Sequence, residues 1–342
     1  MAVAFPFSAI VGQEEMKLAM LVTTIDPTIG GVLVFGDRGT GKSTAVRALA
    51  AILPKMKAVV GCPYACDPES RQAHCEFCAE RKASTARMKI HQLLVPVVDL
   101  PLGVTEDRVV GALNLERALA DGVKVFEPGL LARANRGFLY IDEVNLLEDH
   151  IVDLLIDVAA SGENVVEREG LSVQHPARFV LVGSGNPEEG ELRPQLLDRF
   201  GLSVDVRTPD DLADRIEVVK RRDAFERDPQ AFTELWKKED SKIRRKISHG
   251  REQLASVKVA DEILRQASSL CMKLGTDGLR GELTLMRAAR ALAALESAKT
   301  VSSGHLRRVA PMALRHRLRR NPLDDTASGV RVQRAVDELF NA

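Results

Sequence analysis

Eight residues decide the fold of this chain: Gly36-Asp37-Arg38-Gly39-Thr40-Gly41-Lys42-Ser43. An apolar run of strand type, residues 31–35, precedes them, and residues 44–53 follow with helix-forming side chains at helical spacing. A glycine-rich loop between a strand and a helix lets successive backbone N–H groups face one anion, and the helix adds its positive N-terminal end. We therefore expect a phosphate-binding loop, in which Lys42 reaches the outer phosphates of ATP and Ser43 offers its hydroxyl to Mg²⁺.

The composition is that of an ordinary globular protein. Hydrophobic residues make up 45% of the 342 residues, and 48 basic residues balance 48 acidic ones, which argues against a general polyanion binder. Residues 1–8 lack the features of a signal peptide, and we expect no membrane span because no apolar run is long enough. Five cysteines without an export signal indicate a reducing compartment, the cytoplasm or a comparable organelle interior.

Three parts follow one another along the chain. Residues 1–210 alternate strand-like and helix-like segments, which predicts an α/β nucleotide-binding domain with a parallel sheet, interrupted at 55–94 by a polar, cysteine-bearing insertion. The strand candidates are residues 31–35, 95–99, 137–141 and 178–183. Residues 211–255 are dense in charges and predict a solvated helix or linker, and the amphipathic pattern of 256–342 predicts a C-terminal helical domain.

Two of these apolar runs lead into polar side chains. Asp142 and Glu143 follow the run 138–141, and Asn186 comes shortly after the run 179–182. Asp142 would hold Mg²⁺, Glu143 would polarise the attacking water, and Asn186 would position that water or sense the γ-phosphate. Taken singly, these residues read as solvated acids and a turn residue. After a phosphate-binding loop, they are candidates for the second half of an ATP site.

The order of these segments resembles that of AAA+ ATPases. Residues 196–200 resemble the box that carries an arginine finger, which implies that Arg199 acts on the ATP of a neighbouring subunit. Residues 278–283 resemble the sensor-2 position, which implies that Arg280 touches nucleotide phosphates and couples a helical lid to the nucleotide state. Arg287 and Arg290 are rival candidates for this role on the same predicted helix. The alternative interpretation of Arg280 is a surface salt bridge without a functional role.

Three further segments narrow the resemblance. Ile10 and Val11 lie in a stretch like those that pack against the adenine in AAA+ proteins. Residues 101–111 resemble an insertion in helix 2, and residues 164–175, with a turn at Glu169-Gly170, resemble a hairpin before sensor 1. Both insertions are typical of the clade that holds chelatases, MoxR-type ATPases and MCM helicases.

The most specific similarity is to the I subunits of magnesium chelatases, and it runs from about Phe5 to past Leu323. It includes residues 126–134, 145–150, 183–190 and 193–201. The resemblance implies an AAA+ ATPase core with a C-terminal helical lid, assembled as a ring, expected to be a hexamer. It also implies a D-subunit partner and an H subunit on which ATP hydrolysis drives insertion of Mg²⁺ into protoporphyrin IX. That reaction is the first committed step of (bacterio)chlorophyll biosynthesis, and in a eukaryotic phototroph the compartment would be the chloroplast stroma.

Two alternatives remain open at this point. A MoxR-like metal-loading chaperone ATPase would have similar boxes. A nucleic-acid motor of the MCM or RuvB type would find support in Arg307-Arg308 and in the basic run 315–320. Zero net charge and an aromatic content of 4% weaken this second alternative.

Four cysteines, Cys62, Cys66, Cys75 and Cys78, stand close together in the insertion, with His74 adjacent. The last two have the Cys-x-x-Cys spacing of zinc and redox sites, and the other spacings are less regular. The pattern leaves open a structural metal site, a redox-sensing thiol pair or a set of free thiols. Cys271 stands alone in a helical pattern and is expected in a packed core.

Overall fold

The structure is a computed structural model. It describes residues 3–69, 75–83, 89–114, 125–168, 171–186, 188, 190, 192–276, 278–318 and 328–340. A five-stranded sheet forms the core, in the order β11-β1-β10-β7-β4, with every neighbouring pair parallel. Its strands are β1 (Val32–Gly36), β4 (Val97–Leu100), β7 (Phe138–Ile141), β10 (Val180–Gly185) and β11 (Leu202–Val206).

The sheet confirms the four predicted strands and adds β11, which the sequence reading missed. Ser203 and Asp205 break the apolar run of this strand. Asp205 is exposed, and β11 pairs only with β1 among the described strands, so it lies at an edge of the sheet. An edge strand tolerates such polar positions, which removes the signal used to find it.

Helices cover both faces of the sheet, because successive strand residues point to opposite faces. Val32 and Val34 face α1 (Glu14–Ile25) and α2 (Lys42–Ile52) within one buried apolar cluster. Leu33 faces the other way, into the cluster that contains α6 (Leu130–Ala134) and α7 (Asp149–Ser161). Because neighbouring strands are parallel, their carboxyl ends emerge at the same edge of this covered sheet.

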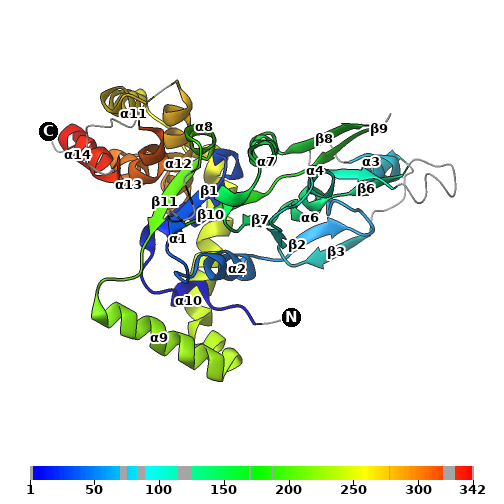
Figure 1. The fold of residues 1–342 in the computed structure, drawn as a ribbon, viewed down its shortest axis with the longest axis horizontal. Coiled ribbons are helices and arrows are strands. Elements are labelled where there is room, and N and C mark those ends of the chain that lie inside the picture. Colours follow the sequence, from blue (N-terminus) through cyan, green and yellow to red (C-terminus); the bar gives the residue numbers. More distant parts are fainter. Residues whose placement is uncertain are drawn as a thin grey trace.

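The insertions gather at one end of the molecule (Figure 1). They comprise β2 (Met56–Val59), α3 (Glu76–Ala83), β3 (Ile90–Leu93), α4 (Glu106–Val110), β5 (Gly111–Leu113), β6 (Phe126–Pro128), β8 (Glu163–Arg168) and β9 (Leu171–Pro176). Strands β8 and β9 are antiparallel, which confirms the predicted hairpin, while its turn at Glu169-Gly170 lies outside the described residues.

The rest of the chain is helical. After α8 (Pro194–Arg199) and β11 come α9 (Leu212–Arg227), α10 (Pro229–Gln253), α11 (Asp261–Leu274), α12 (Arg280–Leu295), α13 (Ser303–Leu314) and α14 (Ser328–Phe340). Short 3₁₀ turns are Phe7–Ala9, Pro27–Ile29, Val144–Leu146, Leu254–Ser256 and Arg315–Arg317. Helices α11 to α14 lie together at the end opposite the insertions (Figure 1). Among the described helices, none has the length and apolar character that a membrane span needs.

The charged stretch 211–255 forms α9 and α10, and most of its side chains are exposed. A few residues nevertheless anchor it. Phe225 and Phe232 pack with Phe5 and Ala9, and the Asp240 carboxylate accepts hydrogen bonds from the backbone N–H and hydroxyl of Ser8. The two helices therefore hold the N-terminal segment in place.

Candidate nucleotide site

The predicted phosphate-binding loop joins β1 to α2. Gly39 and Gly41 have φ of 78° and 82°, a backbone conformation that strongly favours glycine. A Cβ added to Gly36 would lie 1.8 Å from the Val206 carbonyl oxygen, so glycine also lets β11 approach the loop. The local backbone thus forms the cradle that phosphate oxygens require.

Lys42 lies in the first turn of α2 and folds back over the loop. Its Nζ donates hydrogen bonds to the carbonyl oxygens of Gly36 and, at 3.1 Å, Asp37. Burial lowers the pKa of Lys42, while the carboxylates of Asp142, Asp37 and Glu143 act in the opposite direction. Phosphate oxygens can replace these carbonyl partners, so the position fits a triphosphate.

Asp142 follows β7 and is held by two hydroxyl groups. The Ser184 hydroxyl donates to Asp142 Oδ1 at 2.6 Å, and the Tyr140 hydroxyl donates to the same oxygen at 3.0 Å. Tyr140 and Ser184 come from the neighbouring parallel strands β7 and β10. Burial raises the pKa of Tyr140, which keeps its hydroxyl protonated as a donor. Because both donors fix the carboxylate, Asp142 is a suitable ligand for a hard cation such as Mg²⁺.

Glu143 and Asn186 lie beside this carboxylate. Glu143 has a left-handed backbone with φ of 54°, which is strained for a residue other than glycine, and its carboxylate lies 3.4 Å from an Arg38 Nη2 nitrogen. Asn186 is buried, and its Oδ1 accepts a hydrogen bond from the Glu188 backbone N–H at 3.1 Å. Both residues face the same cavity as the loop.

This cavity has a volume of about 840 Å³. The loop lines it from Arg38 to Thr44, together with Asp142, Glu143 and Asn186, and Ile10 and Val11 line it from the N-terminal segment. Gly36 and Asp37 do not line the cavity, but their carbonyl oxygens hold Lys42. The cavity thus joins the predicted phosphate and adenine regions in one space.

Helix α9 forms a wall of the cavity that the sequence reading missed. Val218, Arg221 and Arg222 line it. Arg221 Nη1 donates to the Ala9 carbonyl oxygen at 3.0 Å, and the guanidinium lies 4.6 Å from the centre of the Trp236 ring. Charge density alone gave no signal for this role, since Arg221 resembles any helix-surface arginine in sequence.

Arg199 and Arg280 do not line this cavity. Arg199 Nη1 lies 3.2 Å from Asp153 and 3.1 Å from Asp157, both on α7. Arg280 Nη1 lies 3.1 Å from the carboxylate of Asp198, the residue next to Arg199. The structure therefore brings the two arginines to the same segment, away from the phosphates that this chain itself would bind.

The two rival arginines differ in their surroundings. Arg287 Nη1 donates to the Thr28 carbonyl oxygen at 2.7 Å, and Arg290 is exposed. Neither lines the cavity.

The described basic residues near the C-terminus make internal contacts. Arg307 and Arg308 form ion pairs with Asp337 and Glu296. Arg315 pairs with Glu15 and Asp205, and Arg317 is buried and donates to backbone carbonyl oxygens. Arg319 and Arg320 lie outside the described residues. These contacts argue against the nucleic-acid alternative.

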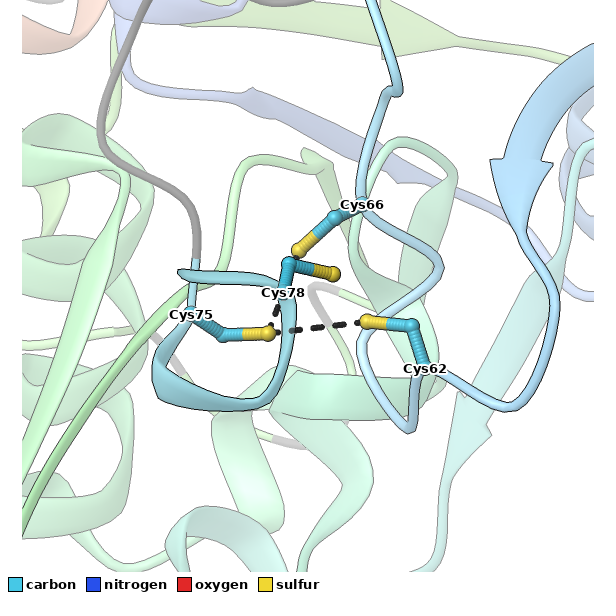
Figure 2. Close-up of side chains that lie close together, drawn as sticks. All are labelled: Cys62, Cys66, Cys75 and Cys78. Atoms are coloured by element: carbon cyan, nitrogen blue, oxygen red, sulfur yellow. Dashed lines mark hydrogen bonds between the residues drawn. The ribbon is translucent and has the colours of Figure 1, made fainter. Parts of the chain in front are cut away.

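The four cysteines of the insertion come together (Figure 2), and none of them lines the nucleotide cavity. The sulfur atoms of Cys62, Cys66, Cys75 and Cys78 all lie within 4.8 Å of one another. His74 lies outside the described residues. Cys271 is buried in α11, as predicted for a packed core residue.

This chain is similar to subunits of magnesium chelatase. A family model described as magnesium chelatase, subunit ChlI, matches residues 114–193, and one described as AAA lid domain matches residues 264–339. A magnesium-chelatase 38 kDa subunit from Acidiphilium rubrum is 68% identical over 98% of this chain and 97% of its own length. The chloroplastic magnesium-chelatase subunit ChlI of Oryza sativa subsp. indica is 52% identical over 98% of this chain and 81% of its own length.

A solved structure is similar over nearly the whole chain. It is a model of the complex between subunits BchI and BchD of magnesium chelatase, based on electron cryo-microscopy. The matched chain is 60% identical, with a TM-score of 0.56, and the match covers 97% of this chain and 100% of that one.

Proposed function

Because this chain belongs to the family of the magnesium-chelatase ATPase subunits, we propose that it is the ATP-hydrolysing motor of a magnesium chelatase. In this function, a ring formed with a D subunit hydrolyses ATP and drives insertion of Mg²⁺ into protoporphyrin IX on an H subunit. The observation that carries the proposal is the single cavity shared by the phosphate-binding loop, Asp142, Glu143 and Asn186.

Each residue of the cavity has a distinct task. The loop amides and Lys42 bind the phosphates, and Ser43 and Asp142 hold Mg²⁺, which neutralises charge on the β- and γ-phosphates. Glu143 orients the attacking water and accepts its proton. The amide of Asn186 positions that water. Arg38, close to the Glu143 carboxylate, holds the side chain in place before ATP binds.

Arg199 and Arg280 complete the site of the next subunit. Both lie outside the cavity of their own chain. Arg199 follows Asp198 in α8, and Arg280 forms an ion pair with Asp198. A head-to-tail ring, expected to be a hexamer, places such a segment of one subunit against the nucleotide of its neighbour. Arg199 then stabilises charge on the transferred phosphoryl group, and Arg280 links the C-terminal helices to that same nucleotide.

Hydrolysis has a clear use in this reaction. Mg²⁺ gives up its water shell reluctantly, and a rigid macrocycle must deform to admit it. A ring whose subunit contacts differ between nucleotide states can deliver that work to a partner. The proposed partners are the D and H subunits, and the compartment is the cytoplasm, or the chloroplast stroma in a eukaryotic phototroph.

A reconstitution tests the proposal. The purified chain is mixed with D and H subunits, ATP, Mg²⁺ and protoporphyrin IX, and magnesium protoporphyrin is followed by its fluorescence. We expect product with the unaltered chain and none with Glu143→Gln, which should still bind nucleotide. Glu234→Gln, the same substitution at an exposed position of α10 outside the cavity, serves as the matched control and should retain activity.

One result would reject the proposal, and a second would then select the alternative. Absence of product from the unaltered chain, when a known I subunit works with the same D and H preparations, would reject the chelatase function. ATP hydrolysis by that same inactive sample would then favour the metal-loading chaperone alternative.

A further inference from the structure

The four cysteines of the insertion form a compact cluster that the nucleotide site does not use (Figure 2). Two come from the turn after β2, and two from the start of α3. The geometry points to a structural zinc site in which Cys62, Cys66, Cys75 and Cys78 are the four ligands. The inference is independent of the proposed ATPase function.

The spacing of the sulfur atoms suits one tetrahedral ion. Zinc–sulfur bonds of about 2.3 Å place the sulfurs of a tetrahedral site about 3.8 Å apart. Cys62 Sγ and Cys66 Sγ each lie 3.6 Å from Cys75 Sγ, and every other pair in the cluster lies within 4.8 Å. All four are free thiols, so disulfide bonding does not account for their proximity.

Tight backbone turns bring the sulfur atoms together. The Cys62 N–H donates to the Val59 carbonyl oxygen at 3.2 Å, and the Ala65 N–H donates to the Cys62 carbonyl oxygen at 3.3 Å. The Cys78 N–H donates to the Cys75 carbonyl oxygen at 3.0 Å. Ala65 adopts a left-handed backbone with φ of 46°, which turns the chain tightly between the first two ligands. These turns fix the positions of the four ligands in the way that supporting contacts do around a metal.

The burial of these cysteines in a small apolar core favours a bound metal. Cys66, Cys75 and Cys78 are buried, and the apolar cluster around them contains few other residues. Val59, Tyr64 and Ala132 are its remaining buried members. Because so small a core cannot stabilise an insertion by apolar burial alone, a metal cross-link supplies what is missing.

The site would fasten the insertion to two other elements. The Asn135 side chain donates to the Tyr64 carbonyl oxygen at 2.7 Å, and Arg136 Nη1 donates to the Ala65 carbonyl oxygen at 3.1 Å. The Tyr64 ring stacks on His175 of β9, with centroids 4.4 Å apart. The loop between the first two ligands therefore links the start of β7 to the β8–β9 hairpin.

The ligand type selects the metal. Four thiolates at tetrahedral spacing favour zinc or iron, whereas Mg²⁺ prefers oxygen ligands in octahedral geometry. The cluster is therefore unsuited to the Mg²⁺ that the proposed reaction consumes. Between the two soft-site metals we assign zinc, since the fastening role needs no redox change.

Metal analysis of the full chain tests the assignment. The protein is purified without chelator from cells supplied with zinc and iron, and zinc and iron are measured by mass spectrometry. We expect about one zinc per chain. Cys66→Ser and Cys75→Ser should lose it, whereas Cys271→Ser, which removes the buried thiol of α11, should keep it.

A second measurement keeps the assignment testable if the serine variants fail to fold. The unaltered chain is exchanged with Co²⁺, and the absorption bands of tetrahedral cobalt thiolate are expected. Hydrogen exchange after zinc removal should rise in residues 56–66 and 171–176, while nucleotide affinity stays the same.

Four outcomes would overturn the assignment. They are fewer than about 0.1 zinc per chain, iron as the bound metal, zinc retained in both serine variants, and a disulfide between cluster cysteines in the freshly purified protein. The last outcome would identify a redox-sensing thiol pair.

Discussion

Ser184→Ala should raise the Mg²⁺ concentration that ATP hydrolysis requires. The Ser184 hydroxyl donates to Asp142 Oδ1 at 2.6 Å from the neighbouring strand, so the substitution removes one of two donors that orient the carboxylate. A hydrogen bond to a charged group contributes about 2 kcal/mol, which corresponds to about a 30-fold change in affinity. Removal of such supporting partners commonly costs about 10- to 100-fold in metal affinity.

The Tyr140 hydroxyl remains in this variant, so the loss of Mg²⁺ affinity should lie near the lower end of the range of about 10- to 100-fold. Tyr140→Phe removes the longer bond of 3.0 Å and should have a smaller effect of the same kind. The double variant should have a larger effect than either single one, but not their sum, because the one Tyr140 hydroxyl proton can instead be donated to the Ser184 hydroxyl, 3.1 Å away.

The assay is steady-state ATP hydrolysis against Mg²⁺ concentration, at fixed ATP. Nucleotide binding in the presence of a chelator is measured in parallel and should not change. Ser203→Ala is the matched control, since Ser203 is a buried serine on β11 that does not line the cavity. An unchanged Mg²⁺ requirement in Ser184→Ala, or an equal shift in Ser203→Ala, would refute the positioning role of Ser184.

Three further predictions concern other residues. Lys42→Ala should weaken ATP binding about 10- to 100-fold in a fluorescent-nucleotide titration, and an equal loss in the control Lys55→Ala would contradict its role. Arg199→Ala should retain nucleotide binding but lose about 10³-fold in turnover, and unaltered hydrolysis would remove Arg199 from the site. Burial and the nearby Arg317 hold the pKa of His316 well below its ordinary value. Its neutral form therefore contributes stability that is present above about pH 6.5 and lost as the pH falls. His316→Gln should weaken the dependence of the urea midpoint on pH between about 7.5 and 5.5, and an unchanged slope would disprove the assignment.

The sequence predicted most of the α/β core because its signals are local. The loop from Gly36 to Ser43 has its own context, and four strands are nearly continuous apolar runs. The predicted roles of Asp142, Glu143 and Asn186 remain to be tested, although the structure places all three in one cavity with the loop. They meet because parallel strands carry their carboxyl ends to the same edge of a sheet.

The features of the site that were not predicted from the sequence depend on contacts between distant segments. Ser184 looks like any small strand residue until β7 and β10 pair and bring it to Asp142. Arg221 lines the cavity only because α9 folds back onto Ala9. The cysteine spacing similarly left three interpretations open, because spacing along the sequence does not show whether the two pairs of cysteines lie close together in the fold.

The C-terminal helices contact the segment that carries Arg199. Arg317 donates to the carbonyl oxygens of Asp198 and Phe200, and Arg280 pairs with the Asp198 carboxylate. These bonds enclose the segment that carries Arg199 and do not reach the cavity of the same chain. If Arg199 contacts the phosphates of the next subunit, a shift of that nucleotide moves Asp198 and, through two arginines, the helices. In the proposed ring, each C-terminal domain would then respond to its neighbour's ATP, and a change could pass from subunit to subunit.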